Sequence, residues 1–346
     1  MATITDVARA AGVSASTVSY VLSGKRAISP ATRARVLDAV DRLGYRPHAG
    51  ARALASSRAH VIGLVAPLHE DADVGIVMEF VRSVTTTARR HDDDVLLLTS
   101  EDPGALERVT AASLVDGLVV MDIEVEDPRT ALLARLGRPS VLIGLPRDAR
   151  GLSCVDFDFA RAARSAVHHL ARLGHRRVGL VSASASSVHR AGYVDRLRSG
   201  FLEAAGAAGV EVATEPCDPA PASARACLAA LRAALPGLTA LVVHHEAALP
   251  HLLDALAAEG TRLPEDLSLV AVGAADPGGR ALRPVDAIEV PVAEVGRVAV
   301  EMLAERTAGS TTSEVRLLSA PLVERGTTAP PPRAGQHPPS GDRHAR

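Results

Sequence analysis

Residues 3–54 read TITDVARAAGVSASTVSYVLSGKRAISPATRARVLDAVDRLGYRPHAGARAL, and this stretch decides the fold of the N-terminal part of the chain. Its apolar residues recur at spacings of three and four, which is the period of an amphipathic helix. Capping residues divide the stretch, since Thr3 and Ser14 precede the first two helices, Ser29 and a proline precede the third, and Gly44 ends it. The pattern predicts three short helices followed by a fourth small one.

A tight turn at Gly12 joins the first two predicted helices, which is the arrangement of a helix-turn-helix. In that motif the second helix enters the major groove of DNA, and its N-terminal residues meet the base edges. Val18, Val21 and Leu22 form the inward stripe of the second helix, so its remaining residues face outward. The alternative is a small three-helix domain with another role.

The stretch resembles the N-terminus of the LacI/GalR family of bacterial transcription regulators. The matching segments are T-I-x-D-V-A-x-x-A-G-V-S, T-V-S-x-V-L, T-R-x-R-V and L-G-Y-R-P, and a looser resemblance continues to about residue 330. It implies a sequence-specific regulator, expected to be a repressor, that binds a palindromic double-stranded operator as a homodimer. The resemblance assigns DNA contacts in the head to Thr5, Ala15, Ser16, Thr17, Ser19 and Tyr20.

Residues 48–57, HAGARALASS, follow the head. In the resembled family this segment is a hinge helix that forms on operator DNA and pushes a leucine into the minor groove, as apolar wedges do in other minor-groove binders. Leu54 matches that leucine and Arg52 lies near it, whereas His48 stands where the family often has Asn. The alternative is a plain interdomain linker, because Gly50 and the short length make the helix marginal on its own.

The charge distribution agrees with DNA binding. Residues 1–60 contain nine basic and three acidic side chains, whereas the remainder contains 29 basic and 37 acidic ones. A basic head on an acidic body is typical of a protein that contacts nucleic acid through the head alone.

From Val61 onward, short apolar runs alternate with helical stretches, which predicts an α/β core of two doubly wound parallel sheets. The first series comprises the strands VIGLVA, DVLLLTS, DGLVVMD and PSVLIG, with helices near 74–91, 104–113 and 128–136. The second comprises SCVDFDF, HRRVGLVSA, LTALVVHH and LSLVAVG, with helices near 159–173, 194–208, 222–234 and 246–259.

The resemblance implies that these two lobes form a periplasmic-binding-protein-like core. It also implies that the chain crosses between the lobes near 158–161, 288–292 and 318–321. The predicted units are a helix-turn-helix head at 1–47, a hinge helix and linker at 48–60, an effector-binding and dimerisation core at 61–328, and a disordered Pro-rich tail at 329–346.

The cleft between the lobes is the expected effector site, because ligands of open α/β sheets bind at the carboxyl ends of strands. Sugar-binding members of the family commonly carry Asn-Asp, Asp-Asp and Gln where this chain has His245-Glu246, Gly273-Ala274 and Val290. This departure weakens the case for a simple sugar. The remaining candidates are Asp122, Asp158, Arg196, His245 and Glu246.

The mixed charge of these candidates suggests a polar effector with donor and acceptor groups and a negative charge opposite Arg196. The alternative is a regulator whose core has lost its small ligand and responds to a protein partner, or to nothing.

Other classes of protein find little support. The chain lacks the G-x-G-x-x-G fingerprint after its first strand, a P-loop and a G-x-S-x-G elbow, so no enzymatic activity and no cofactor are expected. His244, His245, Glu246 and His251 lack metal-ligand spacing, so no metal is expected either. There is no signal peptide or apolar run long enough to span a membrane, and three scattered cysteines suit a cytoplasmic location.

Overall fold

The computed structural model describes residues 2–23, 26–45, 58–66, 68, 74–100, 102–183, 192–273 and 284–332. The predicted hinge helix, with Arg52 and Leu54, lies outside the described residues. None of the described helices is long and apolar enough to cross a membrane. The elements of the head are α1 (Ile4–Ala11), α2 (Ala15–Ser23) and α3 (Pro30–Leu43).

Local capping and one small apolar cluster account for the head. The Thr3 hydroxyl accepts a hydrogen bond from the backbone N–H of Asp6, which confirms the predicted Thr3 cap, and the Asp6 carboxylate accepts one from the backbone N–H of Thr3, so the two residues form a capping box. Val7, Val18 and Val36, one from each helix, are completely buried against one another. The predicted three-helix head is therefore confirmed.

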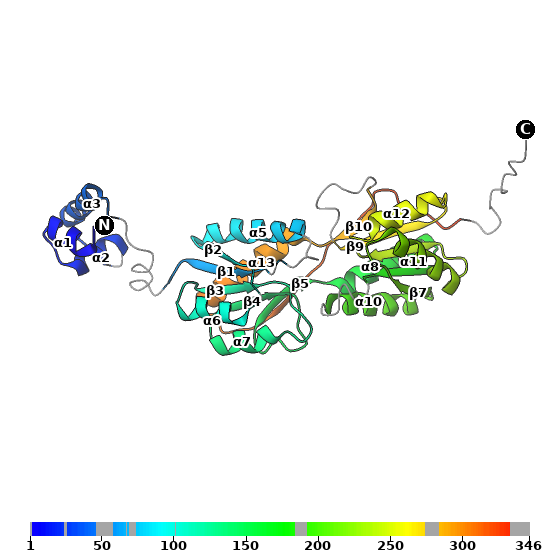
Figure 1. The fold of residues 1–346 in the computed structure, drawn as a ribbon, viewed down its shortest axis with the longest axis horizontal. Coiled ribbons are helices and arrows are strands. Elements are labelled where there is room, and N and C mark those ends of the chain that lie inside the picture. Colours follow the sequence, from blue (N-terminus) through cyan, green and yellow to red (C-terminus); the bar gives the residue numbers. More distant parts are fainter. Residues whose placement is uncertain are drawn as a thin grey trace, which may run out of the picture.

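The strands of the described core form two six-stranded sheets, which lie in separate lobes (Figure 1). In the first sheet the order is β11-β5-β4-β3-β1-β2 and in the second it is β12-β10-β9-β8-β6-β7. All pairings are parallel except that of β10 with β12. The predicted two-lobed α/β core is confirmed.

The first lobe contains β1 (Val61–Val65), α5 (Val74–Ala88), η1 (Arg89–His91), β2 (Asp94–Leu98), α6 (Pro103–Ala111), β3 (Gly117–Val120), α7 (Pro128–Leu136), β4 (Ser140–Ile143), β5 (Ser153–Phe157), α13 (Val292–Thr307) and β11 (Val315–Leu318). One face of its sheet packs on α5 and α13, and the other face packs on α6 and α7 (Figure 1). The sequence groups the strand SCVDF with the second lobe, but β5 pairs with β4 of the first sheet.

The second lobe contains α8 (Phe159–Leu173), β6 (Arg177–Ser182), α10 (Gly192–Ala208), β7 (Glu211–Pro216), α11 (Pro221–Ala234), β8 (Ala240–His244), α12 (Leu249–Ala258), β9 (Ser268–Gly273), β10 (Asp286–Glu289) and β12 (Leu322–Val323). Its sheet is covered by α8 and α10 on one face and by α11 and α12 on the other. Helix α12 begins at Leu249 rather than Glu246, because residues 246–248 form a turn closed by the hydrogen bond from Ala248 N–H to the carbonyl oxygen of His245.

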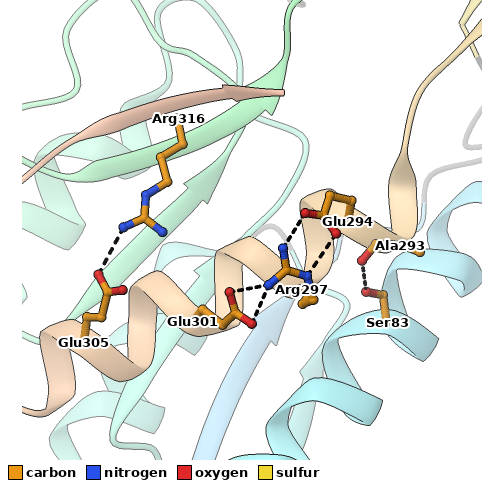
Figure 2. Close-up of polar contacts among 7 residues, drawn as sticks. All are labelled: Ser83, Ala293, Glu294, Arg297, Glu301, Glu305 and Arg316. Atoms are coloured by element: carbon orange, nitrogen blue, oxygen red, sulfur yellow. Dashed lines mark hydrogen bonds and ion pairs between the residues drawn. The ribbon is translucent and has the colours of Figure 1, made fainter. Parts of the chain in front are cut away.

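The chain passes between the lobes three times, from β5 to α8, from β10 to α13 and from β11 to β12. Helix α13 thus returns to the first lobe, where the Ser83 hydroxyl of α5 donates to the carbonyl oxygen of Ala293 at 2.6 Å (Figure 2). The same view shows Arg297 between Glu294 and Glu301, and Arg316 of β11 paired with Glu305. These exposed ion pairs each contribute about 0–1 kcal/mol, so burial of the apolar face of α13 holds it in place.

The end of the described chain belongs to the second lobe. His175 Nε2 donates to the carbonyl oxygen of Ala329 at 2.9 Å, and Ser268 exchanges two hydrogen bonds with Ala329. The Asp286 carboxylate accepts hydrogen bonds from Thr327 and Thr328. Ala329, which the sequence assigns to a disordered tail, is therefore attached to the lobe, because the buried groups of His175 and Ser268 use it as a partner. Residues 333–346 lie outside the described ranges.

This C-terminal network predicts a loss of stability in acid. Burial lowers the pKa of His169 and His175, so below about pH 6.5 the folded state binds fewer protons at these rings than the unfolded chain does. Hydrogen bonds outweigh burial at Asp286 and lower its pKa, so its contribution is lost at still lower pH. We expect the free energy of unfolding, measured with denaturant at pH 8 and pH 5.5, to be lower at pH 5.5.

The neighbouring histidine provides the control. His168 is exposed on the same helix, so His168→Gln should keep the native pH dependence, whereas His169→Gln should reduce it. Equal pH dependence in the native chain and His169→Gln would contradict this origin.

Candidate DNA-reading helix and interlobe cleft

The outward face of α2 is set by the way the helix begins. The Ser14 hydroxyl accepts a hydrogen bond from the backbone N–H of Thr17 at 3.1 Å and lies 2.9 Å from the Thr17 hydroxyl. Thr17 is therefore engaged in the cap, whereas Ala15 and Ser16 of the first turn are exposed. These two residues are free to meet another molecule.

Tyr20 continues this face one turn later, with 38% of its surface exposed. The guanidinium carbon of Arg26 lies 5.8 Å from the centre of the Tyr20 ring, which is within the range of a cation–π contact. Sequence reasoning missed this pair, although a basic residue soon after the predicted helix was a usable signal. Of the other predicted contacts, Ser19 is half-buried and Thr5 is exposed on α1.

The two lobes meet at the first turn of α10. A Cβ atom at Gly192 would lie 3.0 Å from Val125 Cγ2 in the first lobe, so the two lobes approach closely here and any larger residue would have to displace Val125 slightly. One turn further, Arg196 of α10 forms an ion pair with Asp156 of β5. An ion pair therefore joins the second lobe to the first beside the crossing from β5 to α8.

This ion pair is largely removed from solvent, because 28% of the Arg196 side chain and 13% of the Asp156 side chain are exposed. Burial raises the pKa of Asp156, and the charge of Arg196 opposes that rise. The carboxylate that neutralises Arg196 thus comes from the chain itself. The sequence suggests a negative charge of the effector opposite Arg196, and Asp156 occupies that role here.

Aromatic side chains gather next to the ion pair. Phe159 stacks on Tyr193 with ring centres 4.9 Å apart, and both rings contact His244 edge-on at 5.5 and 5.6 Å. Burial, followed by the carboxylates of Glu246 and Asp122, raises the pKa of Tyr193. The whole chain has only seven Phe and Tyr residues, and two of them meet here, next to the ion pair that joins the lobes.

His244 is the most buried polar residue of this cluster. Its Nδ1 lies 2.8 Å from the carbonyl oxygen of Val272, so Nδ1 carries the proton and donates. Its Nε2 is then an acceptor, and it has no hydrogen-bond partner among the described residues. Burial lowers the pKa of His244, which keeps the ring neutral.

The structure divides the predicted effector residues into two groups. Glu246 of the second lobe and Asp122 of the first act on the pKa of Tyr193 through their charges, and Arg196 pairs with Asp156 near the same crossing. Asp158 instead caps α8 by accepting a hydrogen bond from the Arg161 N–H at 2.9 Å, and His245 Nδ1 lies 2.8 Å from the carbonyl oxygen of Cys217. Sequence reasoning missed two residues at this junction of the lobes, Asp156 and Tyr193.

Among the described residues, no three His, Cys, Asp or Glu side chains are grouped so as to hold a metal ion. The three cysteines are free and buried.

Comparison with known proteins explains both parts of this geometry. Residues 3–48 match the family model "Bacterial regulatory proteins, lacI family", and residues 167–328 match "Periplasmic binding protein-like domain". The HTH-type transcriptional regulator CelR of Thermobifida fusca is 30% identical over 332 residues, which cover 91% of this chain and 95% of CelR. The chain belongs to the LacI family. It is a DNA-binding transcriptional regulator.

Three further comparisons extend the match over nearly the whole chain. Catabolite control protein A of Streptococcus mutans is 29% identical, and the alignment covers 94% of this chain and 98% of that protein. The solved structure of a transcriptional regulator CelR–cellobiose complex is 27% identical, covers 94% of this chain and 100% of that chain, and has a TM-score of 0.66. The lac repressor dimer bound to operator and the anti-inducer ONPF has a TM-score of 0.77 at 23% identity, covering 95% and 99%, which shows the shared fold.

Proposed function

We propose that this LacI-family regulator is a cytoplasmic repressor that binds a palindromic operator as a homodimer and is controlled by a small polar effector in the interlobe cleft. One head offers a single short reading helix, α2, so two heads on a symmetric site double the contact with DNA. The ion pair between Arg196 and Asp156 carries the effector part of the proposal, because it joins residues of both lobes at the cleft.

We also propose a division of the chain into units. The head spans residues 1–47, the hinge and linker 48–60, and the core 61–328, followed by a tail whose first residue, Ala329, is attached to the core. Ala15, Ser16 and Tyr20 would select bases, with Thr5, Thr17 and Ser19 in support, and Arg52 and Leu54 would enter the minor groove on the strength of the sequence resemblance alone. None of these roles involves catalysis.

The described cleft residues support an effector rich in hydroxyl groups. Asp156 already neutralises Arg196, whereas Asp122 and Glu246 add carboxylates beside the Tyr193 ring. Carboxylates accept hydrogen bonds from hydroxyl donors, and aromatic rings cover the apolar faces of a ring-shaped ligand. We therefore propose a hydroxyl-rich effector in place of the negatively charged one that the sequence suggests. Because the related CelR structure is a complex with cellobiose, that disaccharide is the first probe.

Thermal unfolding of the full chain with cellobiose, and then with neutral, cationic and anionic metabolites, tests the effector. A compound that binds only the folded core at a hundred times its Kd should stabilise it by about 2.7 kcal/mol. If no compound in the set raises the melting temperature, the alternative of a core that responds to a protein partner is favoured instead.

A variant of the ion pair then tests the site. Arg196→Met should leave operator affinity unchanged without effector, because the head is untouched, and should weaken the response to effector at least about tenfold. Arg198→Met is the matched control, since Arg198 lies exposed on the same helix. A native response in Arg196→Met would remove Arg196 from the effector site.

A further inference from the structure

The segment that leads from the linker into the core is held by two buried aspartates. Both oxygens of the Asp116 carboxylate accept backbone hydrogen bonds, from Ala59 N–H at 2.7 Å and from His60 N–H at 2.8 Å. Asp116 directly precedes β3, and its side chain is 7% exposed. Residues 58–60 are thus attached to the lobe before β1 begins.

The second aspartate, Asp93, lies beside the first and makes contacts with the side chains of the same segment. Arg58 Nη2 is 3.8 Å from Asp93 Oδ2, and Arg58 Nε is 3.7 Å from Asp116 Oδ2. The His60 Nδ1 atom is 3.5 Å from Asp93 Oδ1, which is buried and has no hydrogen bond among the described residues. Two buried carboxylates therefore face one guanidinium, one imidazole and two backbone N–H groups.

Backbone geometry fixes the direction of this segment as well. His60 adopts a φ of +53°, an uncommon conformation for a residue with a side chain, and its carbonyl oxygen accepts from Asp94 N–H at 2.9 Å. Burying a carboxylate costs free energy unless it is paired, so the contacts with residues 58–60 stabilise the lobe as well as the segment. The exit direction of the chain from the core is therefore set by the core itself.

We propose that Asp93 and Asp116 are positioning residues for operator recognition: they hold residues 58–60 so that the linker leaves each core in one direction and the two heads reach half-sites at one spacing. This inference rests on the proposed binding of a palindromic operator by a homodimer. A merely structural role would affect folding, whereas a positioning role affects which spacing the dimer prefers.

The experiment compares the affinity of the full chain for its selected operator with its affinity for the same operator carrying two extra base pairs between the half-sites. The native chain should prefer the selected spacing by at least about tenfold, because half-site spacing is fixed by the geometry of the dimer. Asp93→Asn and Asp116→Asn should lower that preference to about threefold or less. The ratio of the two affinities is unaffected by a change in phosphate contacts, because such a change alters binding to both operators equally.

Two further variants make the result decisive. Asp92→Asn removes the same charge from the neighbouring exposed residue, whose φ of +57° suits Asn, and should keep the native preference. Arg58→Met leaves both buried carboxylates in place and should lower the preference as Asp93→Asn does, even if the aspartate variants fail to fold. A native chain without any spacing preference would contradict the proposed dimeric function, whereas a native preference retained in Asp93→Asn, Asp116→Asn and Arg58→Met would overturn this inference.

Discussion

Gly200→Ala is expected to lower the free energy of unfolding of the core by about 2–3 kcal/mol. A Cβ atom at Gly200 of α10 would lie 2.3 Å from the carbonyl oxygen and 2.7 Å from the Cα atom of Ala160 in α8. These are backbone atoms that cannot rotate away, so α8 and α10 must separate. Alanine is a better helix former than glycine by only about 1 kcal/mol, which is too little to offset the overpacking.

The control lies in the same helix. A Cβ atom at Gly206 meets nothing within 4 Å, and Gly206 is exposed, so Gly206→Ala should raise the free energy of unfolding by about 0.5–1 kcal/mol. Denaturant titration of the native chain and both variants measures the difference. The close approach of α8 and α10 would be contradicted if Gly200→Ala were as stable as Gly206→Ala.

Ala15→Glu should have the largest effect on DNA binding, weakening specific operator affinity by at least about a hundredfold. Ala15 is exposed in the first turn of α2, where the helix-turn-helix presents side chains to base edges. A carboxylate there is repelled by the phosphates and is buried against groove acceptors. The same carboxylate favours the helix N-terminus, so the loss would not come from unfolding of α2.

The matched change is Leu37→Glu, which adds the same charge at a side chain of α3 that is 43% exposed. It should alter operator affinity by less than about threefold at physiological salt, since only general electrostatics change. Fluorescence anisotropy with labelled operator measures both variants. Equal weakening by the two substitutions would mean that α2 does not read the operator.

Features that depend on neighbouring residues could be predicted from the sequence. Two helix caps show this: Thr3 bonds with Asp6, and Ser29 with the N–H three residues later. Because each cap joins residues only three apart, the residue types alone locate the helix starts. The buried strands were equally visible as short apolar runs. The sequence did not show which lobe β5 belongs to. A strand joins the sheet with whose strands it pairs, and β5 pairs with β4 of the first lobe although it directly precedes the helices of the second.

The candidate site depends on contacts between distant residues, and its prediction was correspondingly partial. Arg196 was found by its position in the resembled family, but its partner Asp156 lies 40 residues earlier, in another lobe. The sequence assigns Ala329 to the tail because it adjoins the Pro-rich segment. Its hydrogen-bond partner, His175, is 154 residues away, so no local pattern indicates the contact. The attachment of Ala59 to Asp116 joins residues 57 apart and left no local pattern.

Selection of binding sites from random double-stranded DNA by the native full-length chain, with Ala15→Glu run beside it, tests the central claim most directly. A regulator of this family that binds as a dimer through α2 should enrich one inverted repeat with a fixed half-site spacing, and Ala15→Glu should enrich either no sequence or a different half-site. Enrichment of the same inverted repeat by both chains would contradict the role of α2, and the absence of any inverted repeat with the native chain would contradict dimeric, sequence-specific operator binding.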